Sequence, residues 1–430
     1  MNAKRVFVKS YGCSTNQADG EALSGCLAAA GFVIAGSEPE ADVLVYNCCA
    51  VKGPTEDRMF QILKKAPKNK RLVVAGCLPL ISYDRLLREV QFEGVVGPGL
   101  GRRISTVVER VLQGERVVAL EDSMAGKPEL ALPRLTSNPV ISVVPVSYGC
   151  LGACSYCCVV FARGHLRSCT PEEITERVNA DLDAGAREFW LTSQDVAAYG
   201  RDIQTNLADL LKAVCMVPGD FRVRVGMMNP NLVQDMLSEL VVAFEDSKVF
   251  KFLHLPVQSG NNLVLRSMRR CYTVEEFKEI VSIFRREFPM ITLATDVICG
   301  FPGEAHEAFD ETLSLIDDVK PDVVNVSKFF ARPGTHAAGM LGAVEPAELK
   351  RRSKELSQLA KRISMEQNQR WLRWTGEIVV DEKGKCEGSW IGRNFAYKPV
   401  VVKSPQDLMG KVLCVKVVKA FSSYLSADIQ

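Results

Sequence analysis

Short apolar runs alternate with amphipathic, helix-like segments along most of the chain. The N-terminal part has four such runs, which predict strands at 5–9, 43–47, 72–75 and 95–96. Between them lie segments with helical periodicity, at 18–30, 55–65, 82–89 and 103–112. Near-continuous apolar strands separated by helices are typical of a doubly wound parallel sheet. We therefore expect an N-terminal α/β domain over residues 1–115.

A segment with several prolines and polar residues, 116–139, predicts a linker. Beyond it the alternation resumes, with apolar runs at 140–146, 189–192, 222–227, 251–255, 291–298 and 323–328. The helix at 171–184 opens with Thr170 as N-cap and Pro171 in the first position. Six strand–helix units are too few for a closed eight-stranded barrel. We therefore expect an open, partial (β/α)6 barrel, which occupies 140–370 together with a long charged helix at 345–373.

The C-terminal part, 371–430, changes to short strands punctuated by glycines, at 377–380, 398–402, 412–418 and 424–427. This pattern predicts a small β-barrel, so the whole chain is of the α/β class with an all-β appendage. Aromatic residues here are interleaved with Arg393, Lys398 and Lys403, which fits a surface for base stacking and phosphate contact. The alternative is that these aromatics form the core of the small barrel.

The composition is that of an ordinary globular protein, with 47% hydrophobic and 24% charged residues. A net charge of +2 excludes a polyanion-binding surface over the whole chain, so any nucleic-acid site must be local. No segment near the N-terminus has the apolar core of a signal peptide, and no apolar run is long enough to span a bilayer. We expect a cytoplasmic protein with no membrane partner.

Cysteine is unusually frequent, with 15 residues against only four histidines. An odd cysteine number without a secretion signal argues against a disulfide framework and favours metal binding or catalysis. Cys150, Cys154 and Cys157 lie close together in a C-x3-C-x2-C spacing. A zinc site needs a fourth ligand, for which Cys158, His165 and Cys169 are candidates. A 4Fe-4S cluster is favoured, because three thiolates leave one iron open to a small molecule.

Further cysteines follow the first three predicted strands: Cys13, the pair Cys48 and Cys49, and Cys77. Ligands of open α/β sheets bind beyond the carboxyl ends of the strands, so we expect these cysteines to converge. Adjacent side chains of a strand point to opposite faces, so only one of the pair can serve. The alternative is that each is an ordinary small, buried hydrophobic residue.

Several stretches together resemble the radical S-adenosylmethionine (SAM) methylthiotransferase family, over the whole chain. They are Tyr-Gly-Cys-Ser-Thr-Asn-Gln-Ala-Asp at 11–19, Gly-Cys-Leu-Pro at 76–79, Tyr-Gly-Cys-Leu-Gly-Ala-Cys-Ser-Tyr-Cys at 148–157, Phe-Ala-Arg-Gly at 161–164, Pro-Val-Gln-Ser-Gly at 256–260 and Arg-Pro-Gly-Thr at 332–335. The resemblance is closest to the archaeal and eukaryotic enzymes that act on N6-threonylcarbamoyladenosine of tRNA. It extends to bacterial relatives that act on isopentenyladenosine or on an aspartate of a ribosomal protein.

The resemblance implies two 4Fe-4S clusters and SAM as cofactors. Cys150, Cys154 and Cys157 would hold the cluster that cleaves SAM, and Cys13, Cys49 and Cys77 an auxiliary cluster. Tyr156, Gln194, Asp195 and Gln258 would lie near SAM or substrate, and Arg332 would contact SAM or a phosphate. The chain departs from the family pattern at two positions. Cys158 stands at a usually polar or basic position, and Gln194 stands where relatives of this type often carry glutamate.

The implied reaction is methylthiolation of adenine C2 at tRNA position 37. The C2–H bond is not acidic, so a 5′-deoxyadenosyl radical rather than a base would have to open it. The C-terminal barrel, a TRAM domain in this family, would bind the anticodon stem-loop, and an electron donor and a sulfur donor are further partners. The alternatives are another tRNA adenosine, a ribosomal protein aspartate, or a non-enzymatic RNA-binding protein with a structural metal.

Overall fold

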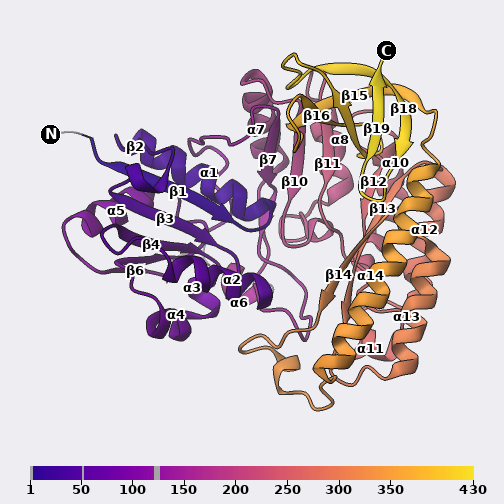
Figure 1. Cartoon of the computed structure of the whole chain (residues 1–430), viewed down its shortest axis with the longest axis horizontal. Helices are drawn as coiled ribbons and strands as arrows, with labels where there is room; N and C mark the ends of the chain where they lie inside the picture. Colours follow the sequence, from indigo (N-terminus) through magenta and orange to yellow (C-terminus); the bar gives the residue numbers. More distant parts are fainter. Residues whose placement is uncertain (1–2, 51–52, 121–125) are drawn as a thin grey trace.

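The computed structural model describes residues 3–50, 53–120 and 126–430. Its N-terminal part is a six-stranded parallel sheet in the order β2-β1-β3-β4-β5-β6 (Figure 1). The strands are β1 (Arg5–Tyr11), β2 (Val33–Ile34), β3 (Val43–Cys48), β4 (Arg71–Gly76), β5 (Gly94–Val96) and β6 (Val117–Ala119). The helices are α1 (Ser14–Ala29), α2 (Gly53–Lys64), α3 (Leu78–Ile81), α4 (Tyr83–Glu89) and α5 (Ile104–Leu112). The parallel α/β architecture expected for this region is confirmed.

Two short strands escaped the sequence pattern. The first, β2, has only two residues, and β6 lies within the segment predicted as a linker. Both lie at the edges of the sheet, where β2 pairs with β1 and β6 pairs with β5. Pairing along a preformed edge stabilises segments that are too short to show periodicity on their own. The domain boundaries at 115, 140 and 371 stay predictions.

Six parallel strands form the central partial barrel: β7 (Ile141–Pro145), β10 (Glu188–Thr192), β11 (Arg222–Val225), β12 (Phe252–His254), β13 (Thr292–Cys299) and β14 (Val323–Lys328). They pair as two three-stranded sheets, β11-β10-β7 and β12-β13-β14. A parallel bridge between Val223 and Val249 links the sheets. Within the described ranges no pairing joins β7 to β14, so the barrel is open.

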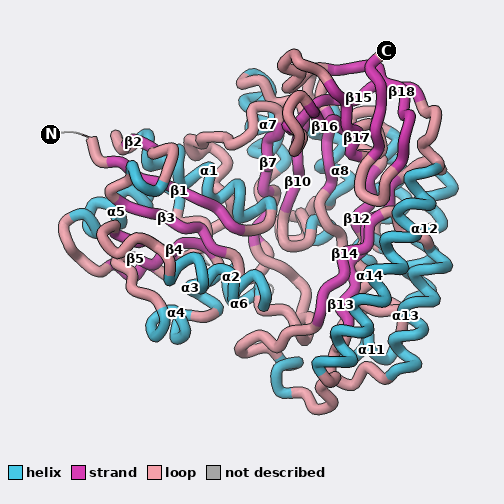
Figure 2. The backbone as a smooth tube through the Cα atoms, in the orientation of Figure 1, coloured by secondary structure: helices cyan, strands magenta, loops and turns pink. Residues whose placement is uncertain are grey.

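Helices cover the outer face of this wall, as Figure 2 shows for α12, α13 and α14 beside β13 and β14. They are α7 (Pro171–Asp183), α8 (Leu207–Cys215), α9 (Pro230–Gln234), α10 (Leu237–Glu245), α11 (Asn262–Ser267), α12 (Val274–Glu287), α13 (His306–Val319) and α14 (Pro346–Gln369). The predicted cap is confirmed, because Thr170 and Glu173 form a capping box at the start of α7. No helix of the described residues combines the length and apolar character required to cross a membrane.

The C-terminal part is a closed five-stranded barrel in the order β15-β16-β17-β19-β18. Its strands are β15 (Thr375–Lys383), β16 (Ser389–Arg393), β17 (Pro399–Lys403), β18 (Val412–Ala420) and β19 (Leu425–Ile429). The predicted small barrel is confirmed. The sequence pattern missed β16, whose five residues include a glycine and a tryptophan in place of a clear apolar alternation.

This small barrel packs against the amino ends of the partial-barrel strands. The amide of Lys251, just before β12, donates to the carbonyl of Phe395 at 2.8 Å. The Lys398 ammonium forms a 2.6 Å ion pair with Asp322, just before β14, and both side chains are buried. The small barrel therefore lies at the opposite end of the partial barrel from the carboxyl ends of its strands, at the top in Figure 1.

The expected RNA-contact surface needs correction at two of its three basic residues. Lys398 is buried by its ion pair with Asp322, and Arg393 pairs with Asp381 and Glu382. The Lys398–Asp322 pair joins the two barrels, whereas the Arg393 pairs link β15 to β16 within the small barrel. Of the three, Lys403 is the one that is exposed. Burial of Trp371 and Trp390 shows that part of the aromatic set forms the core of the small barrel.

Glu188 gives this junction a pH-dependent stability. Its buried carboxyl accepts from the indole Nε1 of Trp190, and burial, with Asp381 nearby, raises its pKa from 4.5 to about 8. A carboxyl whose pKa is higher in the folded state binds more protons there, so stability falls as the pH rises from about 4.5 to about 8. We expect Glu188→Gln, which cannot ionise, to raise the melting temperature at pH 8 and to change it little at pH 5. An equal shift at both pH values would contradict this assignment.

Candidate active site

The loop that carries Cys150, Cys154 and Cys157 follows β7 and is enclosed by the short hairpin β8 (Ser147–Tyr148) and β9 (Arg167–Ser168). Gly149 lets the chain enter the loop. Its φ is +80°, and a β-carbon there would lie 1.9 Å from the carbonyl oxygen of His165. Only glycine adopts this conformation at so close an approach. The hairpin thus places the cysteine loop at the carboxyl end of the first barrel strand.

The Cys150 and Cys154 thiols line one small cradle around Gly152. A β-carbon at Gly152 would meet Cys150 Sγ at 3.3 Å and Cys154 Sγ at 3.6 Å, so a side chain would fill the space between the sulfurs. The Gly152 amide also donates to Cys150 Sγ at 3.2 Å. Burial raises the pKa of Cys150 to about 11 and that of Cys157 to about 12. These thiols therefore need a bound metal to become thiolates at neutral pH.

The donor set fits a cluster better than a single zinc ion. Zinc holds each sulfur at about 2.3 Å, so its ligands must close on one point. Zinc also takes four ligands, whereas this loop offers the three thiols of Cys150, Cys154 and Cys157. In a cubane each thiolate binds a different iron, so the ligands stand further apart. Three thiols are the number of protein ligands that would leave one iron of a 4Fe-4S cluster open.

Arg270 is a site residue that no sequence motif indicated. Its guanidinium donates to Cys154 Sγ at 3.3 Å and to the Asn229 side-chain oxygen at 2.7 Å. It lies in a loop after α11, far from the cysteines in sequence, so only the fold brings it to them. A cation that donates to a sulfur stabilises its thiolate form.

Two of the predicted polar residues support the loop and the barrel rim. Gln194 accepts a 2.8 Å hydrogen bond from the Gly149 amide, which holds the entry of the cysteine loop. Asp195 is buried and accepts from the amides of Ala197 and Asn229. Burial raises the pKa of Asp195 to about 6, and the two amide donors act in the opposite direction. Asp195 therefore fixes the β10 and β11 loops next to Cys150.

Tyr156 and Gln258 lie in different surroundings. The Tyr156 ring packs edge-on against Phe301 at 6.5 Å between centroids, and burial raises its pKa. Gln258 has a left-handed backbone, with φ of +69°, which a residue with a side chain rarely adopts. Its amide donates to the Asp296 carbonyl, and its own carbonyl accepts from Ile298, so the strained residue is fastened to β13. Such strain is common at functional sites.

Arg332 lies at the junction with the N-terminal part. Its guanidinium forms an ion pair with Glu56 of α2, and both side chains are buried. Burial raises the pKa of the Cys158 thiol, and the nearby Arg332 guanidinium acts in the opposite direction. Cys158 itself packs in the hydrophobic core of the N-terminal part. The structure therefore gives both residues a role in holding the two parts together.

The N-terminal cysteines lie at the carboxyl ends of three adjacent strands. Cys13 follows β1, Cys48 is the last residue of β3 and Cys49 comes directly after it, and Cys77 follows β4. The Cys77 amide donates to the Cys48 carbonyl at 3.1 Å. The Cys48 thiol donates to the Tyr46 carbonyl within the core, where burial raises its pKa. The thiol of Cys48 therefore faces the core, whereas Cys13 is exposed.

A buried ion pair joins α1, which follows Cys13, to the segment that follows the Cys150 loop. Arg163, in α6 (Val159–Arg163) just after the cysteine loop, pairs with Asp19 of α1 at 2.5 Å. Asp19 also accepts from the Tyr148 hydroxyl at 2.6 Å. Arg163 lowers the pKa of the Cys77 thiol, which burial raises. One arginine thus links the edge of the N-terminal sheet to the loop of the partial barrel.

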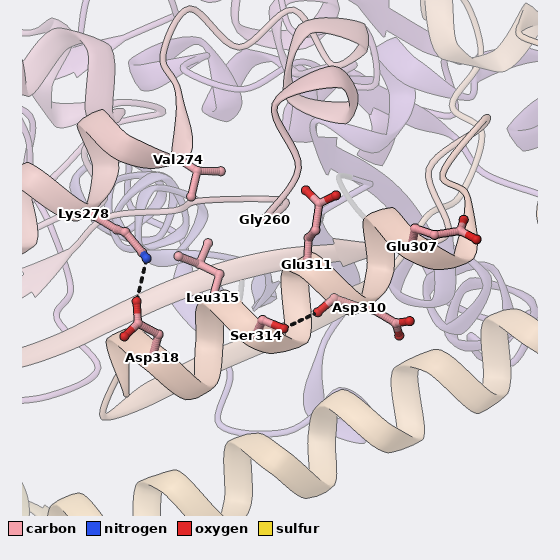
Figure 3. A pocket seen from close by; sticks show the side chains of 9 residues that line it. All are labelled: Gly260, Val274, Lys278, Glu307, Asp310, Glu311, Ser314, Leu315 and Asp318. Carbon is pink, nitrogen blue, oxygen red and sulfur yellow. Dashed lines mark hydrogen bonds and ion pairs between the residues drawn. The ribbon is translucent and has the colours of Figure 1, made fainter.

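One surface hollow is unrelated to this chemistry. It has a volume of about 580 Å³ and lies on the outer face of α12 and α13, where Lys278 pairs with Asp318 (Figure 3). Its other charged side chains are Glu307, Asp310 and Glu311, and it contains no cysteine. An open, acidic helix surface of this kind is an ordinary solvated face.

Family models cover both cysteine-bearing parts. Residues 5–97 match the family described as uncharacterized protein family UPF0004, and residues 144–316 match the Radical SAM superfamily. Enzymes of that superfamily use SAM and a 4Fe-4S cluster, and methylthiotransferases carry two clusters. Among solved structures, the radical SAM methyltransferase TsrM from Kitasatospora setae aligns with a TM-score of 0.58 at 12% identity, over 78% of this chain and 75% of its own. This likeness supports the fold alone.

Relatives that align over the full length of this chain identify the family within the superfamily. A probable threonylcarbamoyladenosine tRNA methylthiotransferase of Pyrococcus abyssi is 41% identical over 430 residues, which cover 99% of each chain. One of Methanothermobacter thermautotrophicus is 40% identical over the full length of both chains. The threonylcarbamoyladenosine tRNA methylthiotransferase of Homo sapiens is 35% identical over 99% of this chain and 74% of its own. The chain is therefore a radical SAM transferase that belongs to the threonylcarbamoyladenosine tRNA methylthiotransferase family.

Proposed function

We propose that this protein replaces the hydrogen on C2 of N6-threonylcarbamoyladenosine, at position 37 of cytoplasmic tRNA, by a methylthio group. The observation that carries the proposal is the buried Asp19–Arg163 pair, which joins the N-terminal cysteine-bearing part to the partial barrel directly after its own cysteine loop. One cysteine set suits the cluster that cleaves SAM, and the other suits the cluster that delivers sulfur. Both steps of the proposed reaction can therefore occur near the same junction.

The cysteines divide between two clusters in this proposal. Cys150, Cys154 and Cys157 hold the cluster that binds SAM, and Cys13, Cys49 and Cys77 hold the auxiliary one. Cys49 rather than Cys48 belongs to the second set, because the Cys48 thiol is engaged in the core. A cluster held by Cys150, Cys154 and Cys157 would supply the single electron that reductive cleavage of SAM requires.

The remaining residues position the reactants and exclude water. Arg270 fixes the Cys154 sulfur, and Gln194 fixes the entry of the same loop. Asp195 and Gln258 shape the rim on which SAM and the adenine lie, and Tyr156 closes the cavity against Phe301. Arg332 does not contact SAM in this proposal and acts indirectly, because its ion pair with Glu56 holds the two parts of the chain together. A dry and rigid rim protects a radical from side reactions.

The RNA partner in the proposal is the anticodon stem-loop. Exposed lysines of the C-terminal barrel offer phosphate contacts, and they are Lys403, Lys411, Lys416 and Lys419. Because this barrel lies beyond the amino ends of the partial-barrel strands, an RNA that touches both it and the cysteine loop must run along the side of the barrel. An electron donor and a sulfur donor complete the reaction as transient partners.

Nucleoside mass spectrometry of tRNA tests the proposal. Cells with the gene should contain the 2-methylthio derivative of threonylcarbamoyladenosine, and cells without it should contain only the unmodified precursor. If cells without the gene instead lack the methylthio derivative of a different adenosine, that adenosine is the substrate. Unchanged tRNA nucleosides together with loss of a modified ribosomal aspartate would overturn the proposal.

A further inference from the structure

The inner wall of the partial barrel carries side chains that the reaction described above does not use. Side chains of a strand alternate between the helices outside and the barrel interior. On β11, Val223 and Val225 pack into the outer core, so Arg222 and Arg224 face inward. The same alternation turns Trp190 of β10 and Phe252 of β12 to the interior, because Leu191 and Leu253 belong to the outer core.

Arg224 is a cation in this interior without a recorded anionic partner. Its guanidinium lies 5.1 Å from the ring centres of Trp190 and Phe252 and 5.2 Å from that of Tyr397. Across the described residues no carboxylate forms an ion pair with it, and its Nε is buried without a hydrogen-bond partner. By contrast, four other inward or buried arginines pair with carboxylates, namely Arg163, Arg332, Arg352 and Arg393.

The nearest inward carboxyl on the neighbouring strand does not supply the missing charge. Glu188 is buried and accepts from the Trp190 indole. Its pKa is raised to about 8 by burial, so it is largely neutral at pH 7. The aromatic rings around Arg224 attract its positive charge, but they do not accept hydrogen bonds from its guanidinium N–H groups as an anion would. The Arg224 guanidinium therefore remains able to bind an anion.

A row of polar side chains lies beside it on the next three strands. His254 of β12 contacts Asp296 of β13 at 3.2 Å, and Asn325 of β14 donates to Asp296 at 2.7 Å. Asp296 and Asn325 are directly opposite each other in the strand register. The side chains of His254 and Asp296 keep 16% and 28% of their surface exposed, so a ligand in the interior can reach them.

Arg224 lies at a depth in the barrel that a substrate could reach if its base were bound at the carboxyl ends of the strands. Arg224 pairs in register with Trp190, and Trp190 stands two residues before the end of β10 at Thr192. Two strand residues span about 7 Å. The cysteine loop follows β7, the strand next to β10. A group that extends a few bonds inward from an adenine at the mouth therefore reaches the level of Arg224.

We propose that Arg224 binds the carboxylate of the threonylcarbamoyl substituent, and that the row of His254, Asp296 and Asn325 meets its urea and hydroxyl groups. This inference rests on the proposed function, and it names the residue that selects the substrate. A threonylcarbamoyl group carries a carboxylate at its far end, whereas an isopentenyl group is apolar and an unmodified adenine has no extension. A planar guanidinium suits a carboxylate, because its two donors match the two oxygens.

The test compares two anticodon stem-loop RNAs on each protein. One carries threonylcarbamoyladenosine, and the other carries the same group with its carboxylate converted to the carboxamide. Affinities are measured for the anaerobically reconstituted full chain by fluorescence anisotropy. Because the readout is the ratio of the two affinities on one protein, a general loss of folding or of SAM binding cancels.

The reconstituted wild-type protein should prefer the carboxylate RNA by about 10- to 100-fold, the range for a hydrogen bond to a charged group. Arg224→Gln should reduce this ratio to near one, and Arg224→Lys should retain part of it. Arg286→Gln, at an exposed arginine of α12, should keep the wild-type ratio. A ratio near one in the wild type, or a ratio that survives in Arg224→Gln, would overturn the assignment. A wild type that shows the preference but forms no methylthio product would contradict the proposed function instead.

Discussion

Replacing Cys150, Cys154 and Cys157 together by alanine will abolish the formation of 5′-deoxyadenosine from SAM. Each cysteine is a ligand of the proposed SAM cluster, and two of the sulfurs lie on either side of Gly152. The auxiliary cluster has its own ligands in the N-terminal sheet. Reconstituted protein should therefore fall from about eight to about four irons per chain. Iron analysis and chromatographic detection of 5′-deoxyadenosine under reducing, anaerobic conditions measure both effects.

A matched control is available on the surface of the same chain. Cys386→Ala, at an exposed cysteine of the C-terminal barrel, should leave both the iron content and SAM cleavage unchanged. Complete loss of iron in the triple variant would show that the two clusters do not form independently. Retention of about eight irons, or a colourless zinc-loaded protein, would contradict the ligand assignment.

Asp19→Ala will destabilise the junction between the N-terminal sheet and the partial barrel by about 3–5 kcal/mol, the cost of leaving a buried charge without its partner. Asp19 and Arg163 are both almost fully buried, and Asp19 also accepts from Tyr148. Removing the carboxylate leaves Arg163 uncompensated beside Cys77, so the auxiliary cluster should be lost preferentially. Thermal unfolding and iron retention of the same samples measure the two consequences.

Two further variants make this prediction specific. Glu40→Ala breaks the exposed pair with Arg5 and should cost no more than about 1 kcal/mol, as surface ion pairs do. The double variant Asp19→Ala, Arg163→Met removes both charges and should recover much of the stability lost in Asp19→Ala. If Asp19→Ala behaves like Glu40→Ala, the junction does not depend on this pair.

The sequence predicted the helices and strands that are long enough to show a regular pattern of apolar and polar residues. The longer strands of the three parallel sheets and four of the five strands of the C-terminal barrel lie where the pattern of apolar and polar positions placed them. Strands such as β2 and β6 were missed because two or three residues carry no period, and they form by pairing at a sheet edge. Local spacing likewise indicated the Cys150 loop, since its ligands are neighbours in sequence.

Side-chain contacts between segments that are distant in the sequence could not be predicted from it. Arg270 reaches Cys154 across 116 positions, and no motif marks it. Lys398 had the composition of an RNA-binding residue, but Asp322 buries it at a junction that local pattern does not encode. Arg224 is similar, because its lack of an anionic partner is visible only when the strands on either side are in place. Side-chain partners depend on the tertiary arrangement, whereas periodicity reports only the element and its buried face.

The central claim is that the adenine C2 hydrogen is removed by a SAM-derived radical at the meeting of the two cysteine sets. The direct measurement uses the reconstituted protein, SAM, a reductant and a stem-loop RNA whose threonylcarbamoyladenosine carries deuterium at C2. We expect the deuterium to appear in 5′-deoxyadenosine and the RNA to gain a methylthio group in its place. Deuterium that stays in the RNA, or is released to water while the RNA is methylthiolated, would contradict the account.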